Sequence, residues 1–347
     1  MSKSKYKKQT MASGGPNWEG LLKWSLAHSD GTGPNRSLSE EDRKWFMEAM
    51  QEQTFDVVKR MKEISLVMQT PEHVLEDQGV TPADIEDLLD ELQEHVESID
   101  MANDLHSIGG LVPLLGYLKN SNANIRAKAA EVVTTIVQNN PKSQKLVMEA
   151  NGFEYLFSLF TSDPVVNVRT KALGAISSLI RDNKPGVIAF RKENNGYEAL
   201  RDSLASESAR FQRKALSLIN YLLRENRYDC IIVNKLGFPC LMVQLASSKD
   251  VDVREGALQG LLELARGKTQ GIREDEKLKQ LLRNRIEDVG AGREERQLLD
   301  SLWNACYNKP SPLREKGLLV LPGEDAPPPD VASKHFEPAL RAMAPKP

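Results

Sequence analysis

Few residues of this 347-residue chain have the types and spacing that catalysis requires. Gly267-Lys268-Thr269 imitates the end of a phosphate-binding loop, in which backbone N–H groups and a lysine hold the phosphates. That motif also needs a glycine at position 262, where the chain has Leu262, and a strand before the loop, where the pattern is helical. The histidines are scattered, and none has a second metal ligand at helical spacing. We therefore expect a protein that is not an enzyme and that needs no metal and no cofactor.

The cysteines and the hydropathy pattern limit the compartment. Cys230, Cys240 and Cys306 have no zinc-site spacing, and an odd number of cysteines cannot all pair. This usage favours a reducing compartment, cytosolic or nuclear. No apolar stretch approaches the 18 residues that a membrane helix needs, so we expect no membrane partner.

The formal net charge of −3 hides an uneven distribution. Residues 72–104 hold twelve carboxylates and no lysine or arginine, whereas residues 108–268 hold 22 basic and 15 acidic residues. The basic excess is too small to predict nucleic-acid binding. An acidic block before a mildly basic array indicates solvated helix faces or a surface for a charged partner.

The strongest pattern is an internal repeat. A glycine is followed four residues later by leucine in four copies. A run of the type Val-Arg-x-x-Ala or Ile-Arg-x-x-Ala comes further on in three of them, and the third copy has Phe211-Gln212-Arg213-Lys214-Ala215 there. The glycines are Gly110, Gly152, Gly196 and Gly237, and the alanines are Ala129, Ala172, Ala215 and Ala257. The alanines are spaced by 43, 43 and 42 residues, a period typical of stacked helical repeats.

Each copy is predicted to be helical throughout. In the second copy, residues 153–160 are apolar on all sides, Asp163-Pro164 breaks the chain, and a longer helix begins at Asn167 or Val168 and runs to about Arg181. We expect the glycines to adopt the left-handed conformation where a short helix ends. One such unit cannot cover its own apolar faces, so the units must stack. We predict an all-α, right-handed solenoid of about four repeats with helical caps.

The flanks divide the remainder of the chain. Thr81-Pro82 begins an apolar stripe that we interpret as one capping helix reaching Leu105, docked on the first repeat. Nine prolines follow Lys309 and predict an unstructured tail. The expected regions are a disordered basic N-terminus (1–16), an N-terminal helical region (17–80), the capping helix with the repeats (81–268), C-terminal helices (269–308) and a disordered proline-rich tail (309–347).

The repeat resembles the armadillo repeat in particular. Armadillo proteins that bind extended peptides carry an asparagine six residues after the alanine, and its side chain bonds the peptide backbone. This chain has Thr135, Ser178, Tyr221 and Glu263 at those positions. The missing asparagines argue against peptide-groove binding of the kind seen in nuclear-import adaptors and junction catenins.

Several stretches together are similar to one family, the armadillo-type nucleotide exchange factors of the 70-kDa heat shock protein chaperones (the Fes-one and heat-shock-protein-70-binding-protein group). They are the helix from Asn17-Trp18 to Leu26, the 99–104 segment, the Gln138-Asn139-Asn140 turn and the 168–181 string. The resemblance covers about residues 17–268, and the extended C-terminal part is similar to plant members.

The resemblance implies a cytoplasmic co-chaperone of the stress response that acts as a monomer. Its concave face would bind the nucleotide-binding domain of the 70-kDa heat shock protein and promote release of ADP and client. In the family a mobile N-terminal segment competes for the client site. The corresponding apolar residues are Trp18, Leu21, Leu22, Trp24 and Leu26, and docking of this helix on its own solenoid is an equal alternative.

The resemblance also suggests partner-binding residues. Ala102 and Asn103 would lie at the lip of the concave face, and Tyr221 would be an exposed anchor. The basic candidates lie near the starts or ends of the long helices, and each could instead lie on a solvated rim or in an internal salt bridge. They are Arg169, Lys171, Arg181, Arg213, Lys214, Arg224 and Arg254. The alternative function is an adaptor that presents proteins or peptides to a ubiquitin ligase or to the import machinery.

Overall fold

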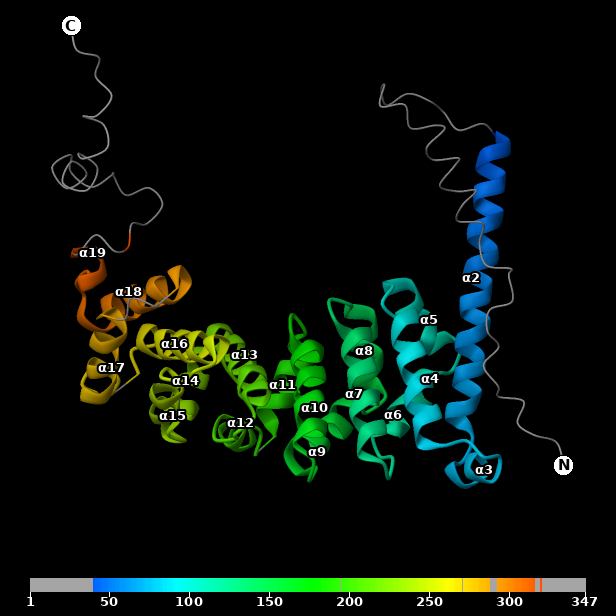
Figure 1. Cartoon of the computed structure of the whole chain (residues 1–347), viewed down its shortest axis with the longest axis horizontal. Helices are drawn as coiled ribbons and strands as arrows, with labels where there is room; N and C mark the ends of the chain where they lie inside the picture. The colour runs from blue at the N-terminus through cyan, green and yellow to red at the C-terminus, as the bar shows by residue number, and fades with distance from the viewer. Residues whose placement is uncertain (1–39, 194, 270, 288–291, 316–318, 320–347) are drawn as a thin grey trace, which may run out of the picture. The chain divides into compact units, whose positions relative to one another are not determined.

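The computed structural model describes residues 40–193, 195–269, 271–287, 292–315 and 319 (Figure 1). Every regular element among these residues is a helix, as predicted. Contacts divide the chain into two compact units, residues 1–193 and 194–347. This division falls just before Gly196, the glycine of the third copy.

In the first unit, three helices of 14 or 15 residues stack in a row, and a 30-residue helix and several shorter ones pack beside them. Helix α7 packs between α4 and α10, and α2 packs on α4, α5 and α6. The bounds are α2 (Glu40–Gln69), α3 (Glu72–Asp77), α4 (Pro82–His95), α5 (Ile99–Ser107), α6 (Leu111–Tyr117), α7 (Ala123–Val137), α8 (Pro141–Glu149), α9 (Gly152–Ser162), α10 (Val166–Ile180) and α11 (Lys184–Lys192).

The second unit follows the same plan. Helix α16 packs between α13 and α18, and the shorter helices α12, α14, α15 and α17 cover them. The bounds are α12 (Gly196–Leu204), α13 (Ala209–Glu225), α14 (Arg227–Lys235), α15 (Phe238–Leu245), α16 (Val251–Arg266), α17 (Glu276–Glu287), α18 (Arg293–Tyr307) and α19 (Pro312–Glu315).

The repeated alanines explain why the long helices can stack closely. Ala129, Ala172, Ala215 and Ala257 have no solvent exposure and lie on α7, α10, α13 and α16. A methyl group at this position lets a neighbouring element approach, and the larger apolar residues around it fill the core. The long helix predicted from Asn167 or Val168 to Arg181 is confirmed as α10.

The predicted single capping helix is wrong. The chain forms two helices, because α4 ends at His95 and α5 begins at Ile99. Thr81 begins α4 with a reciprocal capping box: its hydroxyl accepts the Asp84 N–H and the Asp84 carboxylate accepts the Thr81 N–H. Ser98 has an extended backbone and starts the second helix in a new direction.

The expectation of left-handed glycines holds only at Gly237, with φ of 77°. At the first two copies the left-handed residue is the preceding one, Gly109 or Asn151. Gly110 and Gly152 are instead needed for close packing. A Cβ on Gly110 would lie 2.4 Å from the Ser65 hydroxyl oxygen, and one on Gly152 would lie 2.5 Å from a Val147 methyl carbon.

Candidate partner-binding surface

In the first unit, one face of the long helices carries a ladder of ion pairs. The Lys128 ammonium on α7 pairs with Asp90 on α4, and the Lys171 ammonium on α10 pairs with Glu131 on α7. We call this surface, and the same repeat positions in the second unit, the ladder face. Each rung joins a lysine to an acid on the preceding long helix, so the rungs close the space between neighbouring helices.

A second contact extends the ladder face on α4 and α7. The Gln93 side-chain amide donates to the Thr135 hydroxyl at 3.2 Å. Nearby, Arg60 on α2 forms two hydrogen bonds, of 2.7 and 2.8 Å, with the Glu91 carboxylate. These bonds hold the pKa of Glu91 below its usual range. Part of the negative charge of the acidic block (residues 72–104) is therefore paired inside the solenoid.

In the second unit, the ladder face is hollowed into a groove between α13 and α16. Its volume is about 670 Å³. The residues that shape it are Arg210, Arg213, Lys214, Asn220, Asp252 and Gly256. Three cations and a single carboxylate make this groove basic, and its size admits several side chains of a partner.

Arg213 and Lys214, two of the predicted contact residues, are exposed on this groove. The Arg213 guanidinium donates to the Asp252 carboxylate at 2.8 Å and lies 4.0 Å from Asp250. The Arg213 and Asp252 side chains are 43% and 66% exposed. Exposed ion pairs contribute about 0–1 kcal/mol, so Arg213 can exchange Asp252 for another carboxylate at little cost.

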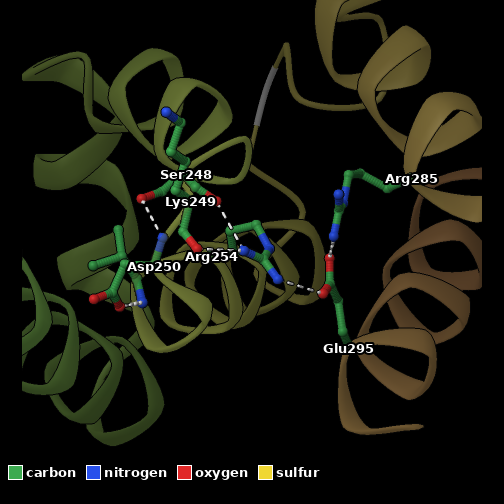
Figure 2. Close-up of polar contacts among 7 residues, drawn as sticks. Ser248, Lys249, Asp250, Arg254, Arg285 and Glu295 are labelled. Atoms are coloured by element: carbon green, nitrogen blue, oxygen red, sulfur yellow. Dashed lines mark hydrogen bonds and ion pairs between the residues drawn. The ribbon is translucent and has the colours of Figure 1, made fainter. Parts of the chain in front are cut away.

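Arg254 does not fit its predicted role as a partner-binding residue, because its side chain holds the repeat together (Figure 2). Its guanidinium donates to the carbonyl oxygens of Ser248 and Lys249 at 2.9 and 3.1 Å. It also donates to the Glu295 carboxylate on α18 at 3.2 Å, and its side chain is only 13% exposed. Arg254 therefore fixes the turn before α16 and is not positioned for a partner.

Arg169 does not fit its predicted partner-binding role either, because its side chain also forms a contact within the repeat. It occupies the same repeat position as Arg254, and its Nε donates to the Phe160 carbonyl oxygen at 2.9 Å. The first repeat has Arg126 there, which donates to the Asn120 and Ser121 carbonyl oxygens at 2.9 Å each. The third has Gln212, which donates to Leu204 and Ser206. In all four repeats this position binds a carbonyl oxygen of the turn before the long helix or of the end of the helix before that turn.

Ala102 and Tyr221 also do not fit their predicted roles at the lip of the concave face and as an exposed anchor. Ala102 on α5 is 4% exposed and belongs to the core, so it does not form a lip. Asn103 accepts a hydrogen bond from the Ser143 hydroxyl at 3.1 Å, which joins α5 to α8. Tyr221 is 9% exposed and is not the exposed anchor that its repeat position suggested.

The remaining basic candidates differ in exposure. Lys171 belongs to the ladder described above. Arg181 is half-buried, and its Nε lies 3.3 Å from the Ser177 hydroxyl oxygen that accepts its hydrogen bond. Arg224 is exposed, and its Nε donates to the Asn220 carbonyl oxygen of its own helix at 3.1 Å. The predicted client-mimic residues Trp18, Leu21, Leu22, Trp24 and Leu26 lie outside the described residues.

Of the eight groove residues, sequence reasoning found Arg213 and Lys214 and missed the other six, which are Arg210, Leu216, Ser217, Asn220, Asp252 and Gly256. Asn220 is buried one position before the asparagine position of peptide-binding repeats, and its side-chain amide donates to the Gly256 carbonyl oxygen at 2.9 Å. The sequence did hold one signal, because Gly256 stands where the other copies have Lys128, Lys171 and Lys214.

The described residues offer little for metal or thiol chemistry. In the part of the chain that the structure describes, no three histidine, cysteine or acidic side chains gather to hold a metal ion. Burial raises the pKa of Cys230 and raises that of Cys306 to about 11, which disfavours the reactive thiolate. Across the same residues, no helix combines the length and apolar character that crossing a membrane requires.

Solved structures of similar shape are armadillo repeat proteins. A designed armadillo repeat protein in complex with the peptide (KR)4 is 17% identical, with a TM-score of 0.57, and the match covers 71% of this chain and 99% of that one. Another designed armadillo repeat protein is 16% identical, with a TM-score of 0.59 and the same coverage. These likenesses show the fold, an armadillo-like helical solenoid.

Sequence comparison identifies the family. Residues 18–105 match the family described as "Nucleotide exchange factor Fes1", and residues 101–234 match the "SIL1/FES1/HPBP1 C-terminal domain". The chain is 26% identical over 311 residues to the "Hsp70-binding protein 1" of Homo sapiens, covering 85% of this chain and 86% of that protein. It is 30% identical over 261 residues to the "Hsp70 nucleotide exchange factor FES1" of Scheffersomyces stipitis, covering 72% of this chain and 86% of that one. The chain belongs to the Fes1 and Hsp70-binding-protein family of nucleotide exchange factors.

Proposed function

We propose that this protein is a co-chaperone that binds the ATPase domain of a 70-kDa heat shock protein and accelerates the release of ADP, and with it the client. The observation that carries the proposal is the match to the exchange factor of Scheffersomyces stipitis, of which the chain covers 86%. The basic groove of the second unit supplies a surface for a folded partner.

Exchange requires differential affinity and no chemical step by this chain. The protein must bind the nucleotide-free, open form of the chaperone more tightly than the closed, nucleotide-bound form. By thermodynamic reciprocity, bound nucleotide must then weaken the complex by the same factor, about 5–150-fold for ordinary coupling. A protein that acts this way needs binding surfaces and no catalytic residues, and it can work as a monomer.

A nucleotide-release measurement tests the proposal directly. Purified chaperone is loaded with fluorescent ADP and chased with unlabelled ATP in a stopped-flow instrument, with and without this protein. We expect the release rate to rise with protein concentration to a plateau. An unchanged release rate would contradict exchange activity and favour an adaptor that only tethers the chaperone.

The groove provides a matched pair of variants for this assay. Arg213→Glu places a carboxylate beside Asp252 in the groove and should reduce the acceleration of ADP release. Arg227→Glu makes the same charge change on the exposed surface of α14 and should retain it. Ala102→Arg is unsuitable here, since a buried arginine would disturb the packing of α5.

We further propose a cytoplasmic location, which the free cysteines Cys230, Cys240 and Cys306 favour because a reducing compartment keeps thiols unpaired. Fractionation of cells that express the tagged protein tests this. Recovery in a secretory compartment would contradict it.

A further inference from the structure

Ser311 begins a short sequence of the kind that proline-directed protein kinases recognise. These kinases modify a serine or threonine that proline follows, because proline has no N–H that their sites must satisfy, and the cyclin-dependent class also binds a basic residue three positions after the hydroxyl. Three hydroxyls of the chain precede proline, and they belong to Thr70, Thr81 and Ser311. Ser311-Pro312-Leu313-Arg314 has an arginine at the required distance, whereas Thr70 and Thr81 have a histidine and an aspartate there.

The structure places this sequence in the contact that attaches α19 to α18. The Ser311 hydroxyl donates to Asp300 Oδ1 at 2.7 Å, and the Arg314 guanidinium donates to both Asp300 oxygens at 2.7–3.0 Å. Ser311 is 0% exposed and Leu313 is 1% exposed. The hydroxyl and the arginine that a kinase would recognise are therefore the same two groups that hold α19 in place.

A kinase can reach Ser311 only when α19 leaves α18. Helix α19 is a single turn of four residues, Pro312–Glu315, and residues 308–310 before it are exposed. Short peripheral segments of this kind open locally at a fraction of the free energy that global unfolding requires. Because kinases bind their substrates as extended segments, the opening that exposes Ser311 also brings it into the form that reacts.

A phosphate on Ser311 would prevent α19 from closing again. Phosphoserine carries about −1.5 to −2 charges at pH 7. In the closed position its oxygens would lie against the Asp300 carboxylate, whose side chain is 3% exposed, and two buried anions in contact are strongly unfavourable. In the open segment the phosphate can bind the Arg314 guanidinium, which then no longer pairs with Asp300.

We propose that Ser311 is a phosphorylation site of a proline-directed kinase and that its phosphate releases α19 from α18. The kinase transfers the γ-phosphoryl group of ATP: the bond from the γ-phosphorus to the bridging oxygen breaks, the bond to the Ser311 Oγ forms, ADP leaves, and the serine proton passes to the base of the kinase. The released segment includes the buried Leu313, so the modification exposes apolar surface at the C-terminal end of the second unit.

The first test locates the phosphate and asks whether opening limits the reaction. The full chain is incubated with a cyclin-dependent kinase and Mg-ATP, and the phosphate is assigned by tandem mass spectrometry. We expect it on Ser311 and not on Thr70 or Thr81. Asp300→Asn weakens the closed contact and should raise the rate by about threefold or more. Asp202→Asn makes the same change at an exposed position of α12 and should leave the rate unchanged.

The second test measures the release of α19. Hydrogen exchange followed by mass spectrometry compares the phosphorylated with the unmodified chain over residues 300–315. We expect exchange to be faster by about twentyfold or more there, and unchanged in α13. Ser311→Asp should act in the same direction. Ser311→Ala loses one hydrogen bond and keeps the pair between Arg314 and Asp300, so its increase should be only about twofold to fivefold.

The outcomes decide the parts of this inference separately. A Ser311 that stays unmodified in both the natural chain and the Asp300→Asn variant would overturn the site. Phosphate on Ser311 with unchanged exchange would overturn the release of α19, and a rate that Asp300→Asn does not raise would overturn the control by opening. None of these measurements uses the chaperone, so their failure leaves the proposed function standing.

Discussion

At the residue scale, the arginines at the starts of the long helices mainly form contacts within the solenoid. Arg126 and Arg254 each donate to two carbonyl oxygens of the turn before their own helix, and each also binds an acid of a later element. Those acids, Asp163 and Glu295, are almost fully buried. A buried carboxylate without a partner is strongly unfavourable, so each arginine supports both its turn and its neighbour.

Arg254→Ala should lower the free energy of unfolding by about 2–3 kcal/mol, because hydrogen bonds to a charged donor are lost at a buried site. Arg285 still pairs with Glu295, which limits the loss. Urea denaturation followed by circular dichroism measures the change. Arg266→Ala removes an exposed arginine from Glu263, which keeps the hydrogen bond from the Gln259 amide at 2.7 Å, and should change stability by less than about 1 kcal/mol. Equal effects would contradict the structural role of Arg254.

Gly110→Ala should be destabilising by about 1–3 kcal/mol, because the added methyl group would meet Ser65 and Leu105 at 2.4 and 2.5 Å. Gly116→Ala is the control in the same repeat. A Cβ at Gly116 meets nothing within 4 Å, and alanine is favoured over glycine inside a helix by about 1 kcal/mol. Thermal melting should therefore shift in opposite directions for the two variants.

At the element scale, the 42–43-residue period predicted stacked helical repeats, and α10 lies where it was expected. The break between α4 and α5 could not be predicted, because the apolar stripe continues through Val96 and Ile99 across it. Buried Val96 and the 57% exposed Ile99 show that the stripe no longer marks one face there. Only the packing of two separate helices distinguishes these positions.

The candidate surface was less predictable than the helices. Sequence reasoning selected basic residues near helix ends, but whether a guanidinium points to a partner or to a turn depends on tertiary geometry. One informative signal was repetition itself. A hydrogen-bonding residue at the same position in all four copies (Arg126, Arg169, Gln212 and Arg254) serves what all copies share, the turn, whereas Gly256 departs from its copies and borders the groove.

Helix α19, the last helix among the described residues, is attached by a third buried carboxylate, Asp300. Arg314 on α19 donates to both Asp300 oxygens, at 2.7–3.0 Å, and the Ser311 hydroxyl donates at 2.7 Å. Burial alone would raise the pKa of Asp300, but the hydrogen bonds from Arg314 and Ser311 outweigh it and hold the pKa below its usual range. Asp300 therefore links the middle of α18 to α19 as an ionised group.

This link should depend on pH in a defined direction. Because the folded pKa of Asp300 is depressed, its contribution to stability is complete above the unfolded pKa of about 4 and is lost as pH falls through the folded pKa. Asp300→Asn should be less stable than the unmodified protein at pH 7, and the two melting temperatures should converge below about pH 4. Curves that stay parallel down to pH 2 would contradict the assignment.

At the scale of the whole molecule, the chain divides into two compact units at residues 193 and 194. In stacked repeats, each element contacts mainly its neighbours, so stability is approximately a sum of local terms. A defect in one unit should therefore remain local, in contrast to the global effect expected for a single compact core.

Hydrogen exchange followed by mass spectrometry can detect this locality. Gly110→Ala should increase exchange in α2 and α5–α7, which pack around Gly110 and Leu105, and leave α16–α18 at the unmodified rate. Arg254→Ala should instead increase exchange in α16–α18 and leave α2 and α5–α7 at the unmodified rate. A uniform rise along the chain in either variant would indicate one cooperative body.

The double contacts of Arg126 and Arg254 limit how freely this solenoid can be rearranged by gene duplication or by design. Deleting the segment that carries Asp163 would leave Arg126 facing a neighbour without its acid, and truncation before Glu295 would do the same to Arg254. Copies of this repeat are therefore interchangeable in shape but not in sequence. An extended or shortened version must transfer each arginine together with the acid that receives it.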